Sequence, residues 1–100
     1  MADSATAVLC LYVRIPDYEP YHRALYLRER TVQEFIRRMA EKYGLNADEG
    51  SRITRVVIRT PIGTVPVVDD DIYALRDETP MFLRCAPIQG EPDTWQLEMS

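Results

Sequence analysis

The chain has 100 residues, of which 46% are apolar, and a formal net charge of −4. This length predicts one domain with a modest core, and this apolar content excludes a disordered tail. No apolar run approaches the roughly 20 residues of a membrane span, so we expect no membrane partner. Because acidic residues outnumber basic ones, 16 to 12, the sequence also lacks the basic surface that binds a DNA backbone.

We interpret residues 1–6 as a disordered leader, or one added by cloning, because they lack the basic and apolar regions of a secretory signal. Residues 7–99 form the predicted domain. Its two cysteines, Cys10 and Cys85, lie in apolar strand-like runs. We interpret both as small buried thiols, since a disulfide framework needs more cysteines and a secretory context. This interpretation predicts a reducing compartment, the cytosol or the nucleus.

Two strands are predicted first along the chain. Residues 7–15 are apolar on both alternating faces, which is typical of a strand inside a covered sheet. Residues 16–20 place two prolines around acidic turn formers and predict a loop. Residues 21–28 predict the second strand.

The clearest element is a helix that begins after Thr31 and ends before Gly44. Thr31 is a good N-cap, and Glu34 three residues later completes a capping box. Apolar residues then recur at i, i+3 and i+4 over three turns, and Gly44 can take the positive φ that ends a helix. We interpret the neighbouring Arg37 and Arg38 as a solvated helix face rather than a binding patch.

The second half of the chain predicts mostly strands. Residues 53–59 and 62–68 are joined by a short turn at Thr60-Pro61, and Pro66 indicates an edge strand because proline cannot donate to the ladder. The remaining expected elements are a short helical turn capped by Asp69-Asp70-Asp71 and running through Leu75, a strand over 79–86, a loop over 87–93 and a strand over 94–99.

This order predicts an α+β fold, a ubiquitin-like β-grasp (ββαββ-turn-β) with an additional C-terminal strand. In such an arrangement the first strand lies between the second strand and the fifth, and it pairs in parallel with the fifth. The helix crosses one face of the sheet. The other face is left open unless the C-terminal strand covers it.

The sequence offers little for catalysis. The single histidine, His22, has no Ser or Cys beside it, and one histidine with two strand cysteines is a poor zinc site. Asp69-Asp70-Asp71 lacks the spaced carboxylates of a calcium loop. Gly63 stands alone in a hairpin rather than in a phosphate-binding loop. We therefore expect no enzyme, and no catalytic, cofactor-binding or metal-binding residues.

A set of residues spread over the whole predicted domain shares its order and spacing with a known family. The set comprises Leu11-Tyr12-Val13-Arg14, Tyr21-His22, Ala24-Leu25-Tyr26-Leu27, Thr31, Ile36, Tyr43-Gly44, Ile53, Gly63, Val67, Asp69-Asp70, Ile72, Phe82-Leu83 and Trp95-Gln96-Leu97. It resembles the C-terminal dimerisation region of grainyhead-superfamily transcription factors, in both the grainyhead and the CP-two branch. The resemblance implies a nuclear transcription factor that binds DNA through a separate upstream domain and acts as a homodimer, with tetramers in the CP-two branch.

The residues indicate a partner surface independently of this resemblance. The side chains expected to face the helix are Leu9, Leu11, Val13, Leu25, Leu27, Met81 and Leu83. Those expected on the open sheet face are Val8, Cys10, Tyr12, Ala24, Tyr26 and Phe82. An exposed apolar patch of this kind usually marks an interface, so we predict an isologous twofold dimer through it, with Arg14 and Arg84 at the rim.

Four alternatives stay open from the residues alone. In the first, the C-terminal strand, or Trp95 alone, would fold over the patch as extra core. In the second, that strand, with Trp95, Leu97 and Met99, would be exchanged between protomers. A Phox-and-Bem-type domain would pair a basic patch with a carboxylate cluster, and its complex would weaken with salt. A Ras-association domain would use Arg23 and Arg28 of the second strand to bind a small GTPase.

Overall fold

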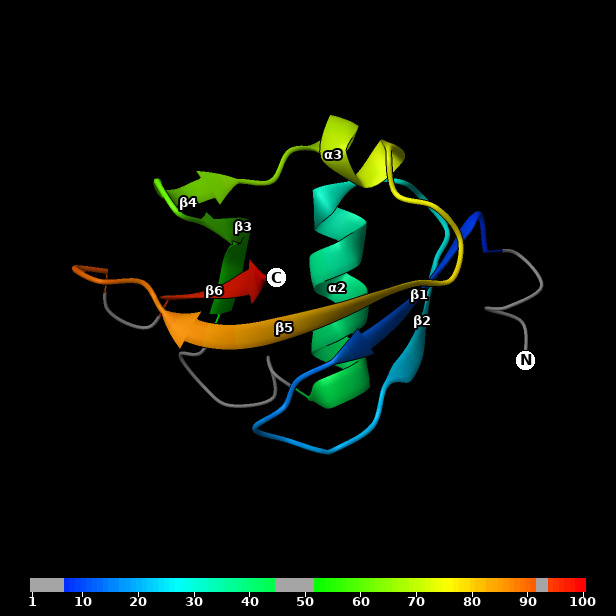
Figure 1. The fold of residues 1–100 in the computed structure, drawn as a ribbon, viewed down its shortest axis with the longest axis horizontal. Helices are drawn as coiled ribbons and strands as arrows, with labels where there is room; N and C mark the ends of the chain where they lie inside the picture. Colours follow the sequence, from blue (N-terminus) through cyan, green and yellow to red (C-terminus); the bar gives the residue numbers. More distant parts are fainter. Residues whose placement is uncertain (1–6, 45–51, 92–93) are drawn as a thin grey trace.

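The computed structural model describes residues 7–44, 52–91 and 94–100, which form an α+β fold (Figure 1). Its sheet has six strands in the order β2-β1-β5-β6-β3-β4. The expected leader over residues 1–6 and most of the expected connection between the helix and the third strand lie outside the described residues, as do Pro92 and Asp93. The described elements are β1 (Leu9–Arg14), β2 (Arg23–Leu27), α2 (Val32–Tyr43), β3 (Arg52–Thr60), β4 (Gly63–Pro66), α3 (Asp69–Tyr73), β5 (Thr79–Pro87) and β6 (Thr94–Met99).

Strand β1 lies at the centre of one half of the sheet, as predicted. It runs antiparallel to β2, with Tyr12 opposite Ala24, and parallel to β5, with Val13 opposite Met81. Strand β4 is at the edge, which confirms the interpretation of Pro66. The observed limits of the strands differ from the predicted limits by at most two residues, and those of β6 are as predicted.

The position of β6 resolves an alternative that the sequence left open. This strand lies within the sheet, antiparallel to β5 and parallel to β3, with Leu97 opposite both Cys85 and Val56. Because side chains alternate along a strand, Leu97 and Met99 turn toward the helix and are buried in the main core, and Trp95 packs against that core. In this structure β6 therefore fills the sheet instead of folding over its open face.

Helix α2 crosses one face of the sheet (Figure 1). Its start and end follow the predicted signals: the Thr31 hydroxyl accepts the Glu34 N–H at 3.1 Å, and Gly44 has a φ of 65°. Phe35 and Met39 are fully buried against the sheet. Burial of each such side chain stabilises the fold by about 2–3 kcal/mol.

The polar face of α2 differs from the prediction in one respect. The buried Glu34 carboxylate accepts the backbone N–H of Arg28 at 2.8 Å, and ion pairs connect it to Arg37 at 2.6 Å and Arg38 at 3.1 Å. Of the two residues predicted on a solvated face, Arg37 is 55% exposed as expected, but Arg38 is only 11% exposed, and both pair with this carboxylate. Glu34 therefore links α2 to the end of β2.

Two of the three adjacent aspartates, Asp69 and Asp71, act as helix caps. Asp71 Oδ2 accepts the Val68 N–H at 2.9 Å at the start of α3. Asp69 Oδ1 accepts the Val32 N–H at 2.8 Å at the start of α2, which joins the two helices. Both carboxylates thus satisfy backbone donors that a helix N-terminus leaves unpaired.

The main core lies between α2 and the sheet. The seven side chains predicted to face the helix are all buried there: Leu9, Leu11, Val13, Leu25, Leu27, Met81 and Leu83. No helix within the described ranges is long and apolar enough to cross a membrane.

Candidate interaction surface

The sheet face opposite α2 carries the predicted patch. We call Val8, Cys10, Tyr12, Ala24, Tyr26 and Phe82 the apolar patch. The strand register places its members side by side, since Cys10 lies opposite Tyr26 and Tyr12 lies opposite Ala24. Val8 is 48% exposed, Tyr12 37% and Phe82 43%, while the other three members are half-buried. The alternation of strands β1, β2 and β5 thus creates a contiguous apolar surface open to solvent.

Phe82 is held on this face by two side chains, one from the neighbouring strand β1 and one from the loop before β2. The Arg14 guanidinium lies 5.5 Å from the centre of the Phe82 ring, and the ring centroids of His22 and Phe82 are 5.4 Å apart. Arg14 Nε also donates to the Glu19 carbonyl at 3.3 Å. Arg14 therefore borders the apolar patch, and His22 packs against Phe82.

One end of the apolar patch is acidic. Asp77 Oδ1 accepts the Cys10 N–H at 2.9 Å, and the Glu78 N–H donates to the Cys10 carbonyl at 2.7 Å. Glu78 has a φ of 63°, a conformation that non-glycine residues seldom adopt. These bonds fix the segment before β5 against β1, so both carboxylates stand beside Cys10 and Tyr12.

The charges at this end act on nearby titratable groups. Glu78 is the main cause of a raised pKa at Tyr12. Burial, followed by the charges of Asp77 and Glu78, raises the pKa of the Cys10 thiol. Burial also raises the pKa of Cys85. Both cysteines are free and half-buried, and a raised pKa keeps them protonated and poorly nucleophilic at neutral pH.

The opposite end of the same face is basic. Arg55 Nε donates to Gln96 Oε1 at 2.8 Å, and Gln96 Nε2 donates to Glu98 Oε2 at 3.0 Å. The Glu98 side chain is only 12% exposed, and its Oε1 lies 3.6 Å from Arg59 Nη1 and 4.0 Å from Arg84 Nη1. We call Arg55, Arg59 and Arg84 the arginine strip.

The arginine strip carries more positive charge than its carboxylate neutralises. Arg59 and Arg84 are 60% and 61% exposed, so both can reach a partner. Arg84 was predicted at the interface rim, whereas Arg55, Arg59 and Glu98 were not predicted. In the sequence, the two arginines of β3 alternate with Val56 and Ile58, and Glu98 follows the buried Leu97. Their grouping depends on β6 lying between β5 and β3, which the sequence did not reveal.

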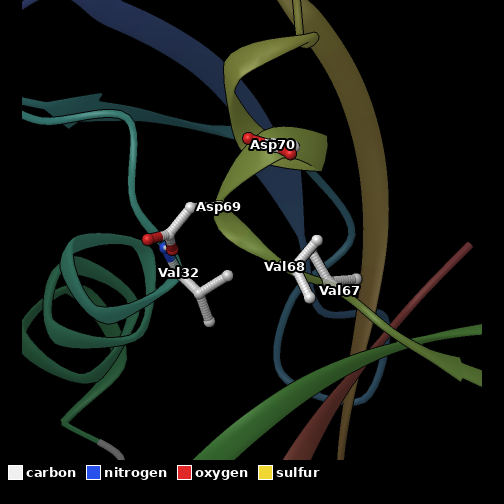
Figure 2. A pocket seen from close by; sticks show the side chains of 5 residues that line it. All are labelled: Val32, Val67, Val68, Asp69 and Asp70. Carbon is white, nitrogen blue, oxygen red and sulfur yellow. Dashed lines mark hydrogen bonds between the residues drawn. The ribbon is translucent and has the colours of Figure 1, made fainter.

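The structure keeps the remaining candidate residues apart. His22 precedes β2, whereas Asp69-Asp70-Asp71 begins α3 on the other side of the sheet. Figure 2 shows a shallow pocket lined by Val32, Val67, Val68, Asp69 and Asp70, in which the Asp69 carboxylate turns toward the Val32 backbone. In the described residues, His, Cys, Asp and Glu side chains form no group of three or more that could hold a metal ion.

Comparison with known proteins identifies a family for this chain. A family model described as "GRHL1-like, C-terminal domain" matches residues 6–96. No curated protein and no solved structure matches the chain. The family match spans all of the described strands and helices except the last residues of β6. The chain therefore belongs to the GRHL1-like C-terminal domain family, which confirms its resemblance to the C-terminal region of grainyhead-superfamily proteins.

Proposed function

We propose that this chain is a homodimerisation domain of a grainyhead-like transcription factor and that it has no catalytic activity. The observation that carries the proposal is the exposed apolar patch on the open sheet face of a domain from this family. Tyr12 and Phe82 are its large exposed members, and aromatic side chains are frequent anchors at the centre of interfaces. Exposed apolar patches on small domains mark binding surfaces.

The finer fold assignment is part of the same proposal. A parallel pair formed by β1 and β5, a leading hairpin and a helix that crosses one sheet face are features of a ubiquitin-like β-grasp. In this description β6 is an addition that lies between β5 and β3. The addition widens the open face and places the arginine strip next to the apolar patch.

The family supports a transcription-factor parent, and we propose that the parent is nuclear and reaches DNA through a separate domain. The net charge of −4 argues against direct DNA contact by this domain. Half-buried, protonated thiols at Cys10 and Cys85 are compatible with a reducing compartment. Tetramers and exchange of β6, with Trp95, Leu97 and Met99, are further assemblies that this proposal allows.

The two adaptor alternatives have less support. Asp69 and Asp71 are engaged as helix caps, so they are poorly placed to act as the acidic partner of a Phox-and-Bem-type pair. Arg23, which a Ras-association domain would present to a GTPase, is paired with Glu19 and lies over the Tyr21 and Tyr43 rings. The family match favours neither alternative.

Multi-angle light scattering of the chain tests the proposal. We expect a mass near twice 11.6 kDa at micromolar concentration. The Tyr12→Asp/Phe82→Asp variant should be a folded monomer, because both aromatic anchors are lost and two carboxylates would have to be desolvated in the interface. Ile62→Asp is the matched control, since Ile62 is exposed in the β3–β4 turn outside the patch. A double variant that remains dimeric would exclude this patch as the interface.

A further inference from the structure

We infer that the charges at the two ends of the apolar patch fix the register of the dimer. In this register, Glu78 of each copy faces Arg84 of the other copy. The twofold axis passes over β5 near Met81. The inference rests on the proposed dimer and specifies its geometry. It commits to a second copy of this chain as the occupant of the open face.

The acidic end is built by backbone hydrogen bonds. Glu78 precedes β5, and its N–H binds the Cys10 carbonyl, while Asp77 binds the Cys10 N–H. Arg30 also reaches this end of β1, but its guanidinium donates to the carbonyls of Val8 at 3.1 Å and Leu75 at 3.1 Å. The carboxylate of Glu78 is thus positioned to meet a cation from a partner.

The basic end lies further along the same strand. From Pro80 onward, alternate residues of β5 share the open face, so Phe82 separates the acidic end from Arg84. Arg84 is 61% exposed and lies 4.0 Å from a carboxylate that Arg59 also contacts. Arg14, opposite Phe82 on β1, adds positive charge on the same side. The face therefore has a charge dipole along the strand direction.

Two copies of this face have complementary charges only when the strands of one copy run in the opposite direction to those of the other. Two stacked sheets lie about 10 Å apart, and six residues of strand span about 20 Å. A twofold axis between the sheets, at right angles to β5, turns one copy end for end. Glu78 and Arg84 are each three residues from Met81 along the chain, so this rotation brings each toward its counterpart. The same rotation places Tyr12 over Arg14 of the partner, which is a favourable cation–π pairing.

Other orientations lack this complementarity. An axis parallel to the strands would leave the two acidic ends together and the two arginine strips together. Like charges placed face to face disfavour a complex and thereby select its orientation. The apolar patch supplies the affinity in this arrangement, and the charges select one orientation.

Charge reversal tests the register. Glu78→Arg alone creates two symmetric Arg–Arg contacts in a homodimer, and Arg84→Glu alone creates two Glu–Glu contacts. Each should weaken self-association about tenfold or more in sedimentation equilibrium at low salt. An equimolar mixture of the two variants should form a heterodimer with wild-type affinity, because both contacts are then Arg–Glu pairs. Asp70→Arg and Lys42→Glu carry the same charge changes on the helices and should leave the affinity unchanged.

The outcomes separate the register from the dimer itself. If Tyr12→Asp/Phe82→Asp is monomeric but the mixture associates no better than either single variant, the register is wrong and the dimer stands. If the wild-type chain is a monomer, the proposed function fails first. The register is supported if affinity recovers in the mixture of Glu78→Arg with Arg84→Glu and not in the control mixture. The same gain in the control mixture of Asp70→Arg with Lys42→Glu would show a general charge effect and overturn the register.

Discussion

The Glu34 carboxylate accepts the backbone N–H of Arg28 at 2.8 Å, which connects the first turn of α2 to the end of β2. The carboxylate is buried, and it also binds Arg37 and Arg38. One side chain thus satisfies a backbone donor and two guanidinium groups. This contact fixes the helix against the hairpin whose outer face forms part of the apolar patch.

We expect Glu34→Gln to lower the free energy of unfolding by about 2 kcal/mol, because hydrogen bonds to a charged group are replaced by weaker neutral ones. Urea denaturation followed by circular dichroism measures this change. Glu41→Gln on the same helix is the control, since Glu41 is exposed and its ion pairs contribute little. Equal losses in the two variants would show that the buried carboxylate has no special role.

The stability of the domain should fall in acid through Glu34. Burial by itself raises the pKa of Glu34, but the Arg28 N–H and two guanidinium groups outweigh it and hold the pKa below its ordinary value. The stabilisation is therefore complete above the unfolded-state pKa and is lost as the pH falls through the folded-state pKa. Urea midpoints measured between pH 6 and pH 3 should decline less steeply in Glu34→Gln than in the wild type. Parallel curves would contradict the assignment.

The helix could be predicted from the sequence because its determinants are local. Thr31 and Gly44 mark the ends of α2 through bonds within a few residues, and the apolar spacing specifies its buried face. The second role of Glu34 could not be predicted. Its contact with Arg28 depends on the path of the chain between β2 and α2, which no periodicity records.

The two halves of the open face were not equally predictable. The apolar patch follows from alternation along β1, β2 and β5, whose neighbours the β-grasp order predicts. The arginine strip requires β6 between β5 and β3, so that Glu98 lies between Arg59 and Arg84. Pairing partners of a C-terminal strand are set by tertiary packing, and alternation alone leaves them undetermined.

We expect Arg30→Ala to loosen α3 with a loss of about 1–2 kcal/mol. The Arg30 guanidinium donates to carbonyls of Val8 and Leu75 and lies 5.7 Å from the centre of the Tyr73 ring, so it joins three segments. Hydrogen exchange should become faster in residues 69–75 and stay unchanged in α2. Lys42→Ala is the control for loss of a helix-side cation, and unchanged exchange in Arg30→Ala would contradict this role.

Leu97→Ala tests whether β6 is an integral strand of the core. Leu97 is fully buried among side chains on the helix side of the sheet, so its truncation should cost about 3 kcal/mol, comparable to other buried leucines. Thr94→Ala, at the start of the same strand, is the control and should cost well below 1 kcal/mol. Urea denaturation at two protein concentrations measures both variants. An equal loss of unfolding free energy at both concentrations would place Leu97 in the core of its own chain. A loss of stability in the dimer alone, with the monomer unchanged, would instead indicate that β6 is exchanged between protomers.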